Sequence, residues 1–174
     1  MKETGLNHNP FIEYLYTLKE DRAALADLRR GLAKKPGTES CMYPYVVRWL
    51  SADCPRQKEA VYYLVAALFG LHPSIAEEGN MGAHFRRAAE KEGESQEAAE
   101  RRFRGLLAAH PEDMPFHLRQ AVSYLKSKEI PICWQQLLAD LIYWGHPDKY
   151  AQRRWAGSYW AYQAKTENTE EQGE

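Results

Sequence analysis

Residues 56–71 read RQKEAVYYLVAALFGL, and this stretch decides how the chain folds. Pro55 stands directly before it, where proline favours the start of a helix, and Pro73 follows His72 at its end. Apolar side chains cover most of the helical circumference, whereas a surface helix has one apolar stripe. We therefore expect residues 56–71 to form a central, largely buried helix with the other helices packed around it.

The rest of the chain has apolar residues at helical spacing and shows no convincing strand pattern. Asn9, Asp21, Asn80 and Ser95 are candidate N-caps. Further helices are expected at about 10–19, between Asp21 and Pro36, and at about 82–91, 95–110, 114–128, 132–144 and 148–164, with a short aromatic segment at 42–50. The sequence predicts an all-α protein, a compact bundle of about eight or nine helices or two small lobes. The sequence contains no repeat of about 34 residues, so a solenoid fold is disfavoured.

A loop at 74–82, rich in glycine, is the expected boundary between lobes. It divides the chain into an N-terminal helical lobe (1–78) that holds the central helix, a C-terminal helical bundle (79–165) and an acidic, disordered tail (166–174). The formal net charge is −1, and the tail contains four glutamates and no base, so residues 1–165 carry about +3. The body of the protein is mildly basic.

Several classes of protein are disfavoured. Three cysteines without C-x-x-C spacing argue against a disulfide framework and a zinc knuckle, and they favour a reducing cytoplasm. The longest apolar run, 60–71, is too short to span a membrane. No H-E-x-x-H, G-x-S-x-G, P-loop or dinucleotide motif is present. We therefore expect that the protein is not an enzyme and that it binds no metal and no cofactor. Five histidines are expected to be helix caps or surface residues: His72, His84, His110, His117 and His146.

Arginine doublets recur along the chain, and a guanidinium is suited to binding phosphate. The cluster at 101–104 has Glu97 and Glu100 within one helical turn, which predicts a surface of paired charges. Arg119 and Lys126 are a better candidate because they share an outer stripe without an acidic residue.

Three more candidates are placed by helical geometry. In the last helix, Arg153 and Trp160 lie seven residues apart on the side opposite the apolar stripe. Trp160 suits a stacked base or a partner surface, and the alternative is that another helix covers it. Arg29 flanks the apolar stripe of the second helix, and Arg56 lies in the first turn of its helix, where a cation opposes the helix dipole.

An ordered set of segments resembles the CasB family, the small subunit of the type I-E CRISPR Cascade surveillance complex. The segments are Leu28-Arg-Arg-Gly-Leu32, Tyr63-Leu-Val-Ala-Ala-Leu-Phe69, Arg101-Arg-Phe-Arg-Gly-Leu-Leu107, Leu118-Arg-Gln-Ala-Val122, and 134–144 followed by Gln152-Arg-Arg-Trp-Ala156. The likeness runs in the same order from about Phe11 to Tyr162.

The resemblance implies an all-helical, non-catalytic subunit present in two copies. Its partners would be a large subunit, a row of backbone subunits, a guide RNA and the displaced strand of the target DNA, which it would hold in the R-loop. The family's basic positions fall on Arg29, Arg30, Arg56, Arg119, Arg153 and Arg154.

Two other hypotheses stay open beside this one. The second is a helical adaptor that binds only protein, with Trp160 and Tyr43-Pro44-Tyr45 as contacts. The third is a helical hydrolase with a bound metal.

Overall fold

The computed structural model describes residues 8–91, 93 and 95–170, with side chains up to Ala161. It confirms the all-α prediction. The helices of the described residues are α1 (Pro10–Thr17), α2 (Arg22–Arg30), α3 (Tyr43–Val46), α4 (Arg56–Leu71), α5 (Met81–Ala89), α6 (Gln96–Leu107), α7 (Met114–Ser127), α8 (Trp134–Ile142) and α9 (Tyr150–Glu170). Short 3-10 turns lie at Gly31–Ala33, Ser40–Met42 and Val47–Trp49. In this part of the chain, the only β pairing is an isolated parallel bridge between Ile75 and Ile132.

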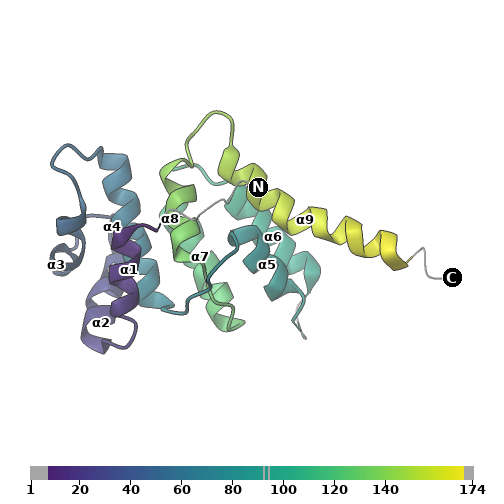
Figure 1. Cartoon of the computed structure of the whole chain (residues 1–174), viewed down its shortest axis with the longest axis horizontal. Coiled ribbons are helices and arrows are strands. Elements are labelled where there is room, and N and C mark those ends of the chain that lie inside the picture. The colour runs from purple at the N-terminus through teal and green to yellow at the C-terminus, as the bar shows by residue number, and fades with distance from the viewer. Residues whose placement is uncertain (1–7, 92, 94, 171–174) are drawn as a thin grey trace.

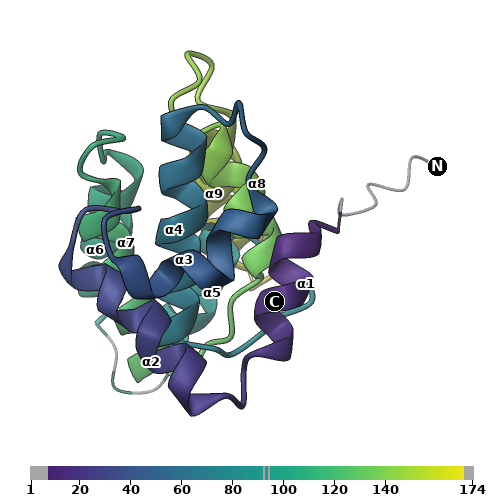
Figure 2. The same ribbon diagram turned by 90° about the vertical axis from the view of Figure 1, so that its left-hand side faces the viewer.

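Helix α4 lies at the centre of the N-terminal half, as its sequence predicts. Every residue from Tyr62 to Gly70 is buried. Helices α2 and α3 pack on one side of α4, and α7 and α8 pack against it from the C-terminal half (Figures 1 and 2). One hydrophobic core extends from Phe11 to Tyr159 and includes residues on both sides of the expected boundary at 78/79.

All four predicted N-caps are confirmed. The side chains of Asn9, Asp21, Asn80 and Ser95 each accept a hydrogen bond, 3.0–3.3 Å long, from a backbone N–H in the first turn of the following helix. These bonds satisfy donors that a helix start otherwise leaves without partners.

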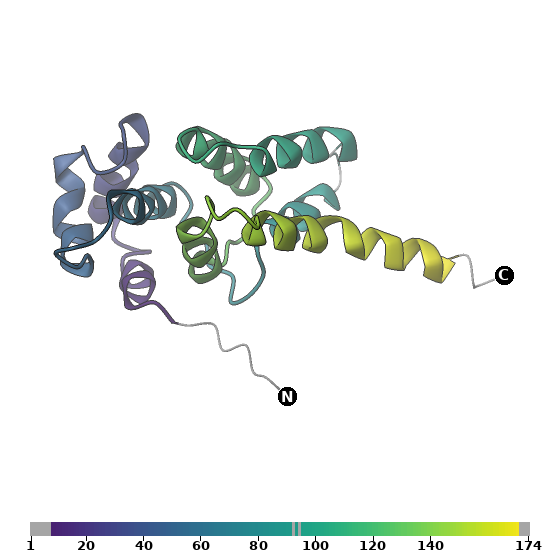
Figure 3. The ribbon, with the colours of Figure 1, turned by 90° about the horizontal axis from the view of Figure 1, so that it is seen from above.

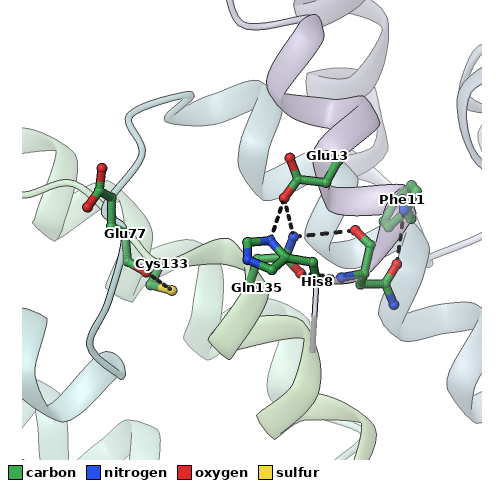
Figure 4. A network of polar contacts seen from close by, with 7 residues as sticks. His8, Phe11, Glu13, Glu77, Cys133 and Gln135 are labelled. Carbon is green, nitrogen blue, oxygen red and sulfur yellow. Dashed lines mark hydrogen bonds and ion pairs between the residues drawn. The ribbon is translucent and has the colours of Figure 1, made fainter. Parts of the chain in front are cut away.

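Helix α1 is held against α8 by polar contacts (Figure 4). The backbone N–H of Asn9 donates to Gln135 Oε1 at 2.8 Å, and Gln135 Nε2 donates to Glu13 Oε1 at 2.8 Å and to the Asn9 carbonyl at 3.3 Å. His8 also contacts Glu13, and this hydrogen bond lowers the pKa of the Glu13 carboxyl. The amide of Gln135 thus joins two segments that lie far apart in the sequence.

Helices α5, α6 and α9 form the far end of the molecule, where α5 and α9 cross closely (Figure 3). A Cβ atom at Gly82 of α5 would lie 1.9 Å from the backbone oxygen of Trp155, so only glycine fits. Helix α9 continues through 166–170, where the sequence predicts a disordered tail, and its last turns extend beyond the other helices (Figure 3). Residues 171–174 lie outside the described residues.

The sequence predicts His72 and His84 as caps or surface residues. His72 is the C-cap of α4, as predicted, although its side chain is buried. For His84 the prediction is wrong, because His84 lies within α5 and is buried. Both imidazoles make a hydrogen bond to the segment 130–133. His72 Nε2 contacts the Ile130 carbonyl at 2.8 Å, and His84 Nε2 accepts from the Cys133 N–H at 3.1 Å. Burial lowers the pKa of both imidazoles, that of His84 to about 4.

No helix in the described part of the chain is both long and apolar enough to cross a membrane.

Candidate nucleic-acid interface

The seven basic residues predicted to bind nucleic acid differ in what their charged ends contact. Within the described residues, Arg56, Lys126 and Arg153 are exposed and make no side-chain hydrogen bond or ion pair. The other four, Arg29, Arg30, Arg119 and Arg154, each make a contact inside the protein. Periodicity placed Arg29 beside the apolar stripe of α2 and Arg119 on the outer side of α7, and it did not reveal these contacts.

Arg29 contributes to packing as well as to surface charge. Its Nε donates to the Gly70 carbonyl at 3.2 Å, so α2 is joined to the last turn of α4. The last carbonyls of a helix have no partner within the helix and favour a nearby cation. The guanidinium of Arg29 is therefore partly committed to this helix end.

Arg30 belongs to a pair of opposite charges. Its Nη1 lies 3.2 Å from Asp27 Oδ1, one turn earlier on α2. The Tyr45 hydroxyl donates to the other oxygen of the same carboxylate at 3.1 Å. The positive charge of Arg30 is therefore partly balanced.

Arg154 is held by a buried carboxylate. Its Nη2 lies 2.5 Å from Asp140 Oδ1, and Asp140 Oδ2 accepts from Trp155 Nε1 at 2.6 Å. The side chain of Asp140 is 1% exposed, whereas that of Arg154 is 59% exposed. Burial raises the pKa of Asp140, and the hydrogen bond from Trp155 and the charge of Arg154 act in the opposite direction. Asp140 fixes one end of the guanidinium and leaves the rest open to solvent.

Beside Arg154, an open depression of about 600 Å³ lies where α8 ends and α9 begins. Tyr143, Tyr150, Arg153 and Arg154 line it, and we call these four residues the α8–α9 face. Tyr143 is 62% and Tyr150 48% exposed, which is unusual for aromatic rings. The Tyr150 hydroxyl donates to Asp148 Oδ2 at 2.7 Å, and its ring lies 4.5 Å from that of His146.

Neither tyrosine of the α8–α9 face was predicted from the sequence. Tyr143 lies one residue beyond α8, and Tyr150 is the first residue of α9, so neither lies clearly on a stripe. One signal was present, because Tyr150 and Arg153 are three residues apart and therefore share a side of α9.

Arg119 and Lys126 are both exposed on α7, as their spacing predicts. Arg119 Nη1 donates a long hydrogen bond, 3.4 Å, to the Leu32 carbonyl. A guanidinium has five N–H donors, so most of this one stays available.

Trp160 packs against α6. This is the alternative to a role in stacking or partner binding that the sequence left open, namely that another helix covers the ring. The Trp160 ring is partly buried, with centroid distances of 5.4 Å to Phe103 and 5.0 Å to Tyr159. Arg104 lies 5.6 Å from its centroid, and the predicted pairing of Arg104 with Glu100 is confirmed at 2.6 Å. These contacts explain Trp160 as a packing residue.

In the part of the chain that the structure describes, no three His, Cys, Asp or Glu side chains form a group able to hold a metal ion.

Comparison with known proteins identifies relatives over nearly the whole chain. Residues 24–160 match the family model of CRISPR-associated protein Cse2. A CRISPR-associated protein Cse2 of Thermus thermophilus is 33% identical over 168 residues, which cover 94% of this chain and 96% of that protein.

Two solved structures have the same fold. A crystal structure of CasB from Thermus thermophilus superimposes with a TM-score of 0.76 at 31% identity, over 87% of this chain and 96% of that chain. A chain of a CRISPR RNA-guided surveillance complex gives a TM-score of 0.76 at 24% identity, over 95% of this chain and 96% of that chain. The chain therefore belongs to the Cse2, or CasB, family of CRISPR-associated proteins.

Proposed function

We propose that this protein is a non-catalytic subunit of an RNA-guided CRISPR surveillance complex, Cascade, where it binds nucleic acid without sequence preference and stabilises the displaced DNA strand. Its partners are the large subunit, the backbone subunits, the guide RNA and a second copy of the chain. Family membership and the shared fold with a chain of a surveillance complex support the assignment to a complex.

The observation that carries nucleic-acid binding is the α8–α9 face. Proteins that bind single strands without sequence preference combine cations that follow the phosphates with aromatic rings on which bases stack. Tyr143 and Tyr150 supply exposed rings, and Arg153 and Arg154 supply guanidinium groups beside them. Because Asp140 holds Arg154, this guanidinium loses little conformational freedom when it meets a phosphate.

The modest charge of the body predicts weak binding by one copy. Residues 1–165 carry about +3, so an isolated chain has few phosphate contacts to offer. Two copies in one complex align their basic surfaces and raise the overall affinity through effective concentration.

The test uses the three cations that are exposed and make no side-chain hydrogen bond or ion pair within the described residues, so that a change in binding does not reflect a lost internal bond. The variant Arg56→Ala/Lys126→Ala/Arg153→Ala, in a reconstituted complex, should bind target duplex more weakly. Each phosphate of a single strand that is no longer neutralised reduces the slope of log K against log salt concentration by about 0.7. The loss of three cations should therefore make this slope shallower by roughly 2.

A matched control removes the same charge from other exposed arginines, Arg22, Arg87 and Arg101. The control should keep most of the affinity. Equal affinity and slope for the wild type and the first variant would contradict nucleic-acid binding by Arg56, Lys126 and Arg153.

The adaptor hypothesis has its own observation. Tyr43 and Val47 are exposed; Tyr43 is the first residue of α3, and Val47 directly follows its last. If this surface only binds protein, Tyr43→Ala/Val47→Ala should abolish assembly, whereas the charge variant should behave as the wild type.

A further inference from the structure

A cavity of about 190 Å³ lies between the first turn of α7 and the segment 31–42. Its apolar walls include Leu32, Met42, Tyr63 and Phe116, and its lining also includes Lys35 and Arg119. The volume is below the roughly 300–1,000 Å³ of sites for drug-sized ligands. One ring system fits such a space, and a larger ligand does not.

The wall formed by the segment 31–42 is held in place by local contacts. Lys34 Nζ and Glu39 Oε2 form an ion pair at 2.7 Å across the turn. The Tyr43 hydroxyl donates to the carbonyl of Gly37, whose φ of +85° favours glycine at the bend. The cavity therefore exists in the unbound chain, which lowers the cost of ordering it on binding.

The charge at this cavity is positive. Glu39 is paired with Lys34, so these two charges balance each other. Lys35 and Arg119 remain, and Arg119 uses one N–H for the long bond to the Leu32 carbonyl. A cavity with apolar walls and two extra cations fits an aromatic group that is attached to an anion.

Phe116 begins a stripe that continues along α7. Phe116, Arg119, Ser123 and Lys126 follow each other at intervals of three and four residues, which places them on one side of the helix. All four are exposed, and Phe116 is 63% exposed although its ring is large and apolar. The stripe is about 15 Å long, at 1.5 Å per residue, and has no acidic member.

We propose that this cavity binds one base of a single-stranded nucleic acid, stacked on Phe116, while the adjacent phosphates contact Arg119 and Lys126. This inference rests on the proposed function and names a second contact surface for it, separate from the α8–α9 face. The positive charge and the acid-free stripe favour a nucleic acid over an aromatic side chain of a protein, which would carry no phosphate to meet the cations.

The experiment compares two single-stranded probes of equal length in the reconstituted complex, an oligothymidylate and an abasic oligonucleotide. Phe116→Ala should weaken binding of oligothymidylate about 5- to 150-fold, the range expected when one base–aromatic stack is removed. Binding of the abasic probe should not change, because it has phosphates and no bases. Phe116→Trp should retain the affinity for oligothymidylate, because it keeps an aromatic ring at this position.

Four outcomes separate this inference from the proposed function. If the wild-type complex binds neither probe more tightly than a complex without this subunit, both proposals fail. If the wild type binds both probes and Phe116→Ala reduces the affinity for neither, the base site is wrong and nucleic-acid binding stands. If Phe116→Ala stops the complex from assembling, the cavity receives a protein side chain and the base site is again wrong. A photocrosslink from a 5-iodouracil probe to Phe116, found by mass spectrometry, would support the site directly.

Discussion

Asp140 accepts a hydrogen bond from the Trp155 indole at 2.6 Å, and this contact joins α8 to α9 inside the core. Asp140→Ala leaves the indole N–H buried without a partner and should lower the free energy of unfolding by about 2 kcal/mol. Asp140→Asn keeps an acceptor and removes a buried charge whose pKa burial already raises, so it should cost less than half as much. Urea unfolding of both variants measures this, and equal stability of Asp140→Ala and the wild type would contradict it.

His84 should make stability depend on pH. It is buried, and its pKa is lowered to about 4, against an ordinary value of 6.5. Between these values the unfolded chain binds a proton at this residue and the folded chain does not. The contribution of His84 to the free energy of unfolding is therefore fully present above about pH 6.5. It is lost as the pH falls toward 4, which lowers the free energy of unfolding by about 3 kcal/mol.

The measurement is urea unfolding of the wild type and His84→Gln from pH 7 to pH 4. The wild type should lose more stability than the variant over this range, while His72 adds a change of the same sign to both. Parallel curves would show that His84 does not cause the dependence.

Gly82→Ala should destabilise the crossing of α5 and α9. The added Cβ would meet the Trp155 carbonyl, a backbone atom that cannot turn away, so we expect a cost of about 2 kcal/mol or more. Gly105→Ala is the matched control, because nothing lies within 4 Å of its added Cβ on α6. This variant should gain up to about 1 kcal/mol from helix propensity. Thermal unfolding compares the two, and opposite shifts are expected.

Arg29→Ala should reduce stability as well as charge, because it removes the hydrogen bond to the Gly70 carbonyl. The expected cost is about 1 kcal/mol. Arg153→Ala changes the net charge equally and breaks no side-chain hydrogen bond or ion pair within the described residues, so its stability should stay near that of the wild type. If both variants unfold at the same urea concentration, the Arg29 hydrogen bond does not contribute.

Trp160→Ala should act through packing. The ring lies against Phe103 and Tyr159, so its removal should cost about 2 kcal/mol, and Trp160→Phe should recover part of this. Calorimetry measures both. A Trp160→Ala variant with normal stability and reduced affinity for single-stranded DNA would instead identify Trp160 as a stacking residue.

The helices and their starts could be predicted because the signals are local. Residues 62–70 of α4 are all buried, and the apolar composition of this stretch shows it without a structure. A cap such as Asn9 or Asp21 contacts a backbone group only two or three residues away, so the residue type and its place are enough. The ion pair of Glu100 with Arg104 is local in the same way.

The candidate site was predictable only in part. Periodicity placed Arg119 and Lys126 on the outer side of α7, but it does not say which neighbour a side chain meets. The cavity that we propose as a base site forms because the segment 31–42 lies against α7, and these two regions are about 80 residues apart in the sequence. Tyr143 and Tyr150 lie at helix ends, where the turn between α8 and α9 decides their exposure.

The sequence alone determined the all-helical class, the central helix, the caps and the family resemblance, because each depends on residue type and on neighbours within a few positions. Only the tertiary structure decided which arginines are free. Arg29 meets Gly70 and Arg154 meets Asp140 because helices distant in the chain pack together. Arg56, Lys126 and Arg153 meet no such partner within the described residues, and this difference comes from packing that no local pattern contains.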